Sequence, residues 1–261
     1  MSTAITLDVT DGVARVRLNR PEVHNAFDDA LIAELTRTLE AVTADPDARV
    51  LQLHGTGKSF CAGADLNWMR RMADYDHAQN LADARRLAHM LHLLYALPKP
   101  TVAVVQGPAY GGGVGLVACC DIALAGPRAA FSLSEIKLGL IPATISPFVA
   151  EAIGARATRK LSLTGERIDA HEAQRLGLVH ELLADDDVLG ARAHELSALL
   201  ANYGPQTLAE VKALIAAVAA RPIDEALHAD TARRIADARC APEGREGVAA
   251  FLARRKPAWP R

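Results

Sequence analysis

Short apolar runs that fit β-strands alternate with longer runs of helical periodicity over the first half of the chain. The runs "AITLDVT" and "VARVRLN" flank Asp11-Gly12, a dipeptide typical of a tight hairpin turn. In residues 28–42 apolar residues recur at helical spacing, which predicts a helix with Asp28 or Asp29 as its N-cap. Further strands are predicted at 49–55 and 101–107, and a helix from about Ala78 to Leu97.

This alternation predicts an α/β fold with largely parallel strands, because helical crossovers return the chain to the same edge of a sheet. From about residue 199 the strand signals stop and alanine-rich helical patterns run to the end of the chain. Alanine favours helix but provides little surface for packing, so we expect this segment to dock against something else. The predicted division is an α/β core at 1–198, with the active site, and a helical oligomerisation segment at 199–261.

Composition narrows the classes of protein. The 261 residues are 50% hydrophobic with a formal net charge of -2, which gives no argument for a nucleic-acid or membrane partner. No uninterrupted apolar run is long enough to span a bilayer, and the first residues do not resemble a secretory signal, so we expect a cytoplasmic protein. The four cysteines form no metal-binding spacing and are expected to be buried free thiols: Cys61, Cys119, Cys120 and Cys240.

The stretch "AYGGGVGLVACCD" concentrates four glycines within residues 111–115. Glycine inside an element costs roughly 0.5–1 kcal/mol relative to alanine, so the cluster indicates a demand on the backbone itself. Gly113-x-Gly115-x-x-Ala118 fits a dinucleotide-binding fingerprint, but "GPAYG" separates these glycines from the preceding strand, which disfavours that interpretation.

A second small-residue loop, "GKSFCAGADLNWM" at 57–69, also leads into a helical pattern. Two such loops could each offer one backbone N–H to the same oxygen atom, which is the arrangement of an oxyanion hole. Tight turns packed for steric reasons alone remain the alternative explanation of the glycines.

Four ordered motifs, "LNRPEVHNAF", "GKSFCAGADLNWM", "PKPTVAVVQGPAYGGGVGLVACCDIALA" and "FSLSEIKLGLIP", resemble the enoyl-CoA hydratase/isomerase (crotonase) superfamily. "GADLNWMRRM", "LSEIKLGL" and "ISPFV" resemble its 3-methylglutaconyl-CoA hydratase branch in particular. The resemblance implies a spiral of ββα units, a C-terminal helical segment that forms a trimer or a dimer of trimers, and an acyl-CoA substrate. It implies no metal and no cofactor other than the coenzyme A of the substrate.

The resemblance also implies roles for individual residues. The oxyanion-hole N–H groups would be those of Ala64 and Gly112, and Glu135 would be the catalytic carboxylate. Asp65 is expected to shape its loop or cap a helix. Lys58 and Lys256 are candidates for the coenzyme A phosphates, Lys256 as a contribution to a neighbouring subunit. The complete set expected at the substrate and coenzyme A is His24, Ala26, Lys58, Ala62, Asp65, Leu66, Gly111 and Lys256.

Gly115 departs from the family pattern, because two-glutamate hydratases carry their first glutamate at this position. One carboxylate suits double-bond migration, whereas two suit hydration. Our hypothesis is a hydratase whose branched, glutaconyl-type substrate places its own carboxylate in the space left at Gly115, or in which another residue orients the water. The alternatives are a Δ3,Δ2-enoyl-CoA isomerase using Glu135 alone, a decarboxylase or thioesterase, and an acyl-CoA-binding protein without catalysis.

Overall fold

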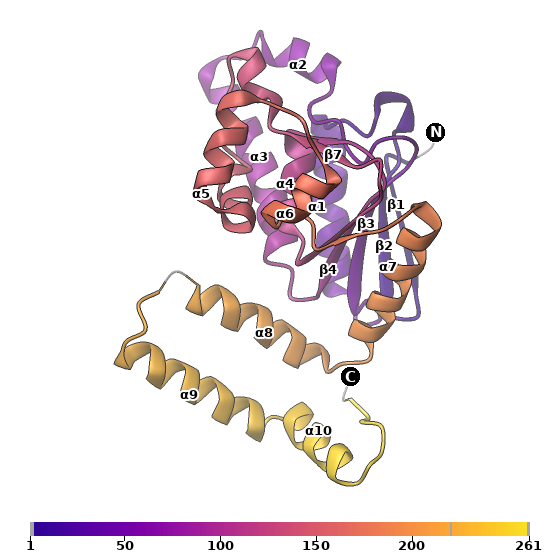
Figure 1. The fold of residues 1–261 in the computed structure, drawn as a ribbon, viewed down its shortest axis with the longest axis vertical. Coiled ribbons are helices and arrows are strands. Elements are labelled where there is room, and N and C mark those ends of the chain that lie inside the picture. Colours follow the sequence, from indigo (N-terminus) through magenta and orange to yellow (C-terminus); the bar gives the residue numbers. More distant parts are fainter. Residues whose placement is uncertain (1–2, 220, 260–261) are drawn as a thin grey trace.

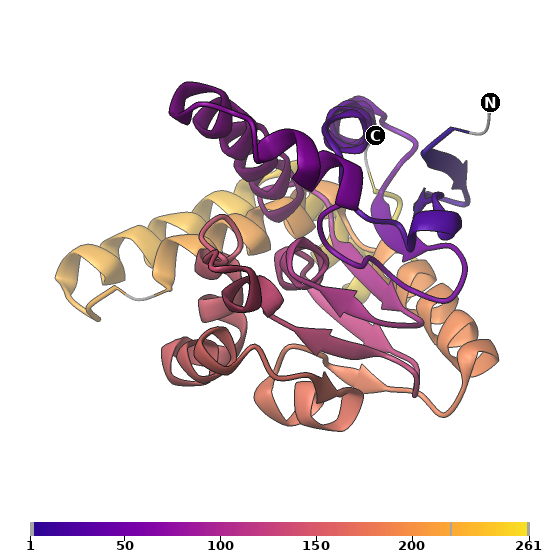
Figure 2. The ribbon, with the colours of Figure 1, turned by 90° about the horizontal axis from the view of Figure 1, so that it is seen from above.

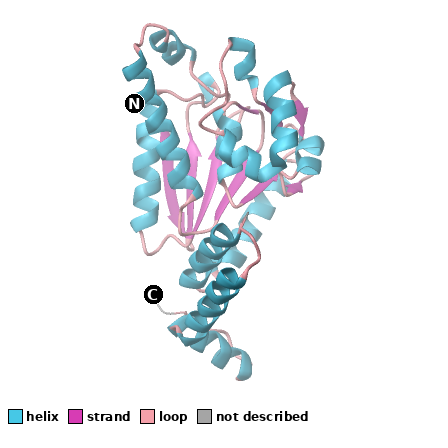
Figure 3. Ribbon diagram, turned by 90° about the vertical axis from the view of Figure 1, so that its left-hand side faces the viewer, coloured by secondary structure: helices cyan, strands magenta, loops and turns pink. Residues whose placement is uncertain are grey.

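A six-stranded sheet forms the centre of the computed structural model, which describes residues 3–219 and 221–259 (Figures 1 and 3). The first two strands form an antiparallel hairpin, and all later strands of the sheet pair in parallel. Asp11 and Gly12 at the hairpin turn both have positive φ, as the sequence predicts. In sheet order the strands are β1 (Ile5–Thr10), β2 (Val13–Leu18), β3 (Val50–Gly55), β4 (Thr101–Val105), β6 (Ile122–Ala125) and β9 (Glu181–Leu182).

A second, smaller layer contains β5 (Ala109–Tyr110), β7 (Ala130–Ser132) and β8 (Ile168–Asp169). Cys61 extends this layer through a parallel bridge to Ala109. Three successive turns of chain therefore place one strand in the large sheet, a second strand or bridge in the small layer, and then a helix. This repeat is the expected ββα spiral, and its helices are α3 (His77–Tyr95), α4 (Gly112–Cys119) and α5 (Ser146–Thr164).

Helix boundaries follow local capping chemistry. Helix α1 (Asp29–Ala44) begins at Asp28, whose carboxylate accepts a hydrogen bond from the Leu31 amide at 2.7 Å. Helix α3 begins at a capping box formed by Asp76 and Gln79, one residue before the predicted start. The remaining elements of the core are the 3₁₀-helices η1 (Pro21–Val23) and η2 (Ser134–Leu138), α2 (Leu66–Met72), α6 (Ala170–Leu176) and α7 (Asp186–Ala201).

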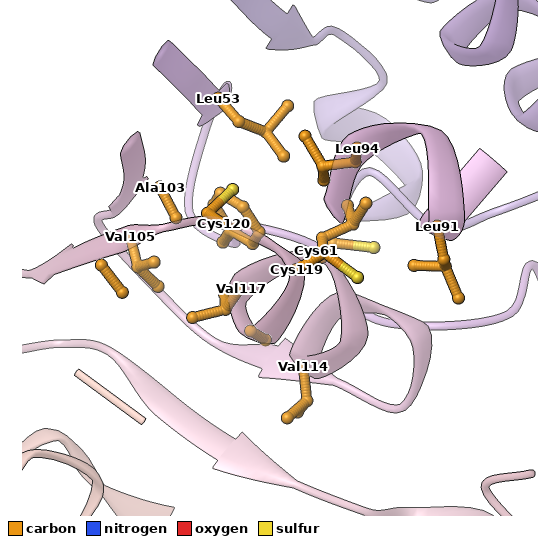
Figure 4. Packing of buried hydrophobic residues seen from close by; sticks show 14 of the residues in the cluster. Leu53, Cys61, Leu91, Leu94, Ala103, Val105, Val114, Val117, Cys119 and Cys120 are labelled. Atoms are coloured by element: carbon orange, nitrogen blue, oxygen red, sulfur yellow. The ribbon is translucent and has the colours of Figure 1, made fainter. Parts of the chain in front are cut away.

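Helix α4 lies in the middle of the hydrophobic core. Figure 4 shows Val117 of this helix beside Val105 of the large sheet, and Cys119 on the side of the helix that lies toward Leu91 and Leu94 of α3. Cys61, Cys119 and Cys120 belong to the same core, and burial raises the pKa of the Cys61 and Cys120 thiols to about 12. The expectation of buried thiols is wrong for Cys240, which is exposed because it ends a helix of the C-terminal segment.

The last three helices extend away from the core as an arm (Figures 1 and 2). They are α8 (Pro205–Val218), α9 (Glu225–Cys240) and α10 (Pro242–Leu252). Residues 198 and 199 lie within α7, which packs on the large sheet, and the arm begins at Pro205. The arm is attached by Lys212, whose ammonium group contacts Asp121 Oδ2 at 2.7 Å, where β6 begins. None of the helices in the described ranges is long and apolar enough to cross a membrane.

Candidate active site

Three neighbouring chain segments reach the same edge of the small layer. Cys61 pairs in parallel with Ala109, and β5 pairs in parallel with β7. The amide of Tyr110 donates to the carbonyl of Cys61, and the amide of Gly111 donates to the carbonyl of Ser132, both at 2.9 Å. Because the carboxyl ends of parallel strands meet at one edge, the residues that follow these strands emerge together. Those residues are Ala64, Gly112 and Glu135.

The amide of Ala64 is left free by its neighbours. Phe27 donates its N–H to the Gly63 carbonyl at 2.6 Å and accepts the N–H of Asp65 at 2.7 Å. This parallel bridge uses the groups on either side of Ala64, so the N–H of Ala64 points away from Phe27. Within the described ranges no acceptor is found for it. Ala64 therefore presents one backbone donor at an exposed position.

Gly112 presents a second backbone donor. It is the first residue of α4, where an amide has no intrahelical acceptor, and the helix dipole favours negative charge at this end. A Cβ added at Gly112 would lie 2.7 Å from Cε2 of Phe27, so a larger residue would displace the ring. Phe27 thus contacts both donors, Ala64 through the backbone bridge and Gly112 through its ring.

The other glycines allow the turns of the spiral to approach one another. A Cβ on Gly63 would lie 3.0 Å from the Tyr110 carbonyl oxygen, and one on Gly113 would lie 2.4 Å from that of Cys61. Gly63 and Gly111 also have positive φ, which glycine adopts without strain. Steric packing, the alternative explanation of the glycine cluster, therefore applies as well, because this close packing brings the two backbone donors together.

Glu135 lies against the same backbone. It belongs to η2, directly after β7, and a Cβ added at Gly111 would lie 2.9 Å from its Oε1 atom. Its Oε2 atom is buried without a hydrogen-bond partner among the described residues. Burial raises the pKa of this carboxyl above its usual value of 4.5. A half-buried, unpaired carboxylate of raised pKa is suited to accept and return a proton.

The space beside Gly115 is filled. A Cβ at this position would lie 2.3 Å from Cγ2 and 2.9 Å from Cβ of Ile145, and 3.5 Å from Cδ2 of Leu91. Ile145 is itself buried at the start of α5. Ile145 therefore fills the space next to the Gly115 backbone. A glutamate carboxylate would lie several bonds farther out, so the hypothesis that a substrate carboxylate takes that position stays a prediction. No local pattern predicts this contact, which joins residues thirty positions apart in the chain.

The backbone of the "RPEVHNAF" motif is largely engaged within the chain. His24 donates its amide to Pro21 and accepts from the amide of Ala62, while Ala26 donates to Val23 and accepts from Arg20. The His24 ring contacts the Ser59 hydroxyl at 3.0 Å. What these residues retain for a ligand is the second lone pair of each carbonyl, and their place at the coenzyme A stays a prediction.

Arg20, Asn25 and Asp65 form a polar network behind Ala64. Asp65 caps α2 by accepting from the amides of Asn67 and Trp68, as expected, and Arg20 pairs with both Asp65 and Asp28. Buried Asn25 donates to three carbonyls of the loop that precedes Ala64: those of Thr56, Ser59 and Phe60. Sequence reasoning assigned this motif to the ligand and missed its role as a support for the loop.

The remaining predicted residues are spread over the surface. Leu66 follows the donor loop and is 69% exposed, and Lys58 is exposed in the same loop. Lys256 is also exposed, in a tail whose Trp259 donates to the carbonyl of Asn202, just after α7. That end of α7 lies against the loop before β3, at the opposite edge of the large sheet from the site. Within one chain Lys256 does not join the other residues.

Comparison with known proteins agrees with this geometry. The model of the family described as enoyl-CoA hydratase/isomerase matches residues 8–261. The 2,3-dehydroadipyl-CoA hydratase of Escherichia coli is 37% identical over 249 residues, covering 94% of each chain. The 1,2-epoxyphenylacetyl-CoA isomerase of the same organism is 34% identical over 260 residues, covering 98% of each. The crystal structure of an enoyl-CoA hydratase from Shewanella pealeana superposes with a TM-score of 0.95 at 44% identity, over 98% of this chain and 96% of that one. The chain belongs to the enoyl-CoA hydratase/isomerase family.

Proposed function

We propose that this enzyme adds water across the α,β double bond of an enoyl-CoA, and that its acyl group is of the branched, glutaconyl type. The observation that carries the proposal is that two backbone donors, at Ala64 and Gly112, meet the Glu135 carboxylate, and that all three lack hydrogen-bond partners among residues 3–219 and 221–259. This set of groups matches a reaction in which a thioester oxygen gains negative charge while a proton moves nearby.

The steps follow from the groups present. Glu135 removes a proton from water, the water oxygen bonds to the β-carbon, and the π electrons move onto the thioester oxygen. The N–H groups of Ala64 and Gly112 stabilise the resulting enolate, each by about 3 kcal/mol. Glu135 then returns the proton to the α-carbon, which restores the carboxylate and the thioester. These reaction steps require no metal and no cofactor beyond the coenzyme A of the substrate.

A carboxylated acyl group is supported by similarity. The relative named 2,3-dehydroadipyl-CoA hydratase acts, by its name, on an acyl chain that ends in a second carboxylate. Because Ile145 fills the space next to the Gly115 backbone, the distal carboxylate of such a substrate would have to lie beyond that side chain.

Double-bond migration is the second candidate. One carboxylate is sufficient for it, since the same base removes a proton from one carbon and returns it to another. The absence of a carboxylate at Gly115 favours this reaction.

We also propose that the enzyme is a homo-oligomer, a trimer or a dimer of trimers. An open groove of about 750 Å³ separates the core from α8, and it is lined by residues of α3, α4, α5 and α8, most of them apolar. The arm carries several exposed apolar side chains, including Ile215, Val248, Phe251 and Leu252. A neighbouring subunit would cover these surfaces and would also provide the route by which Lys256 reaches a coenzyme A.

The experiment is incubation with 3-methylglutaconyl-CoA and, separately, crotonyl-CoA in water labelled with heavy oxygen, followed by mass spectrometry of the acyl group. A labelled hydroxyl in the carboxylated product, absent with Glu135→Gln, is the expected result. Label in crotonyl-CoA as well would make the enzyme a general hydratase. No label in either, together with conversion of a 3-enoyl-CoA to the 2-enoyl form, would replace the proposal by the isomerase. Binding without any turnover would indicate a protein without catalysis.

A further inference from the structure

We infer that Ile145 is a specificity-determining residue, which excludes a carboxylate from position 115 and thereby restricts the site to the single carboxylate of Glu135. The steric part of this inference depends only on the geometry around Gly115. The part that concerns the reaction rests on the proposed function.

The contact between the two positions is too short for any side chain at 115. The added Cβ meets both Cγ2 and Cβ of Ile145 at less than 3.0 Å, a separation that real Cβ atoms do not show. The atoms in the way are the branch point of Ile145 and a methyl bonded to it. They are not the end of a flexible chain, so a small rotation does not relieve the clash.

Ile145 cannot move aside easily. Its side chain is 1% exposed, and its carbonyl accepts the amide of Val149 in the first turn of α5. The next residue, Ser146, is fixed by two hydrogen bonds to the Pro142 carbonyl, one from its amide and one from its hydroxyl. A β-branched side chain has few χ1 rotamers. Backbone and side chain together hold the methyl against Gly115.

The location of this contact explains its effect on the chemistry. The amide of Gly115 donates to the carbonyl of Gly111, one helical turn away, and Gly111 is the residue that contacts the Glu135 carboxylate. Ile145 and Leu91 therefore place hydrocarbon one turn along α4 from the catalytic carboxylate. A glutamate at 115 and an isoleucine at 145 are mutually exclusive, so exchange of both residues is needed to create a two-carboxylate site.

A double-mutant cycle tests the steric part without any assay of activity. Gly115→Ala is expected to lower the thermal midpoint sharply, because the methyl group alone produces the clash. In the background of Ile145→Gly, which removes both clashing atoms, the same substitution is expected to cost much less. Equal effects of Gly115→Ala in the two backgrounds would overturn the inference.

The reaction is tested with Gly115→Glu in the Ile145→Gly background. We expect at least a tenfold gain in the hydration of crotonyl-CoA over Ile145→Gly alone, with the label taken up from heavy-oxygen water. If this double variant folds and gains nothing while the wild type is active, the inference is overturned. If the wild type hydrates no substrate, the proposed function is wrong. A gain of hydration in the double variant would still support the role of Ile145.

Discussion

The carboxylate of Glu135 is more buried than that of a surface glutamate. Its Oε2 atom is buried without a hydrogen-bond partner in the part of the chain that the structure describes, and burial raises the pKa of the carboxyl above its usual 4.5. Ionisation is therefore less favourable in the folded chain than in the unfolded chain. The resulting cost to folding is present above the raised pKa and disappears as the pH falls below 4.5, where both states are protonated.

Glu135→Gln should consequently separate activity from stability. We expect turnover to fall by roughly 100-fold or more, as is usual when a general base is removed. We expect the thermal midpoint to rise at pH 7.5, because the amide avoids the burial of a charge. Thermal denaturation at several pH values checks this, and the advantage of the variant should shrink toward zero near pH 4. If the higher thermal midpoint of Glu135→Gln did not change with pH, the buried charge of Glu135 would not be its cause.

Phe27 is a positioning residue for both backbone donors, because it brackets Ala64 through its backbone and supports Gly112 with its ring. Phe27→Leu keeps the backbone bridge and removes part of the ring contact, so we expect kcat to fall about tenfold with little change in KM. Leu39→Ala is the control, since that side chain of α1 is equally buried and lies outside the donor loops. Equal losses of kcat in the two variants would mean that the effect is only one of packing.

At the scale of elements, the sequence predicts what local chemistry controls. The hairpin, α1 and α3 follow from turn residues, caps and periodicity, and the structure confirms them within one or two residues. The two-residue strand β5 carries no periodic signal of its own, and its pairing with Cys61 and β7 depends on the stacking of the spiral. For the same reason the contacts of Gly115 with Ile145, and of Phe27 with Gly112, could not be read from local patterns.

The cap of α2 links an element boundary to the site. Asp65→Ala removes the N-cap of α2 and the ion pair with Arg20 beside the Ala64 amide, so we expect a loss of about 1–2 kcal/mol in stability and a lower kcat. Asp76→Ala removes the cap of α3 and serves as the matched control, with a loss of stability and unchanged kcat. Chemical denaturation and steady-state kinetics on both variants measure the two effects. An unchanged kcat in Asp65→Ala would show that the cap does not support the donor.

At the scale of the whole molecule, the arm exposes more apolar surface than an isolated chain requires. Val248 and Phe251 lie one turn apart on α10, and the two residues are 59% and 81% exposed. Helix α8 has no buried residue, so this chain alone provides little packing for the arm.

Assembly should therefore depend on α10. We expect the wild type to be a trimer or a dimer of trimers. The double substitution Val248→Asp with Phe251→Asp should shift it toward the monomer, because it would bury two charges in an apolar contact between subunits. Light scattering after gel filtration measures the mass. Leu7→Asp, at an apolar position of β1 that is 43% exposed, is the control and should leave the mass unchanged. A monomeric wild type would remove this interpretation.

The origin of the two donors in the backbone has a consequence for how such a site evolves. Any substitution at residue 64 or 112 other than proline alters bulk and loop shape but keeps the backbone N–H, so the part that would stabilise the proposed enolate is encoded by the path of the chain. The proton-transfer part depends on side-chain identity and can be rewritten by single codon changes. In a saturation library, substitutions at Glu135 should therefore abolish activity because the carboxylate is lost, and substitutions at Gly112 because a larger side chain distorts the backbone. New reactions should arise when side-chain carboxylates are gained, lost or moved while the ββα spiral stays the same.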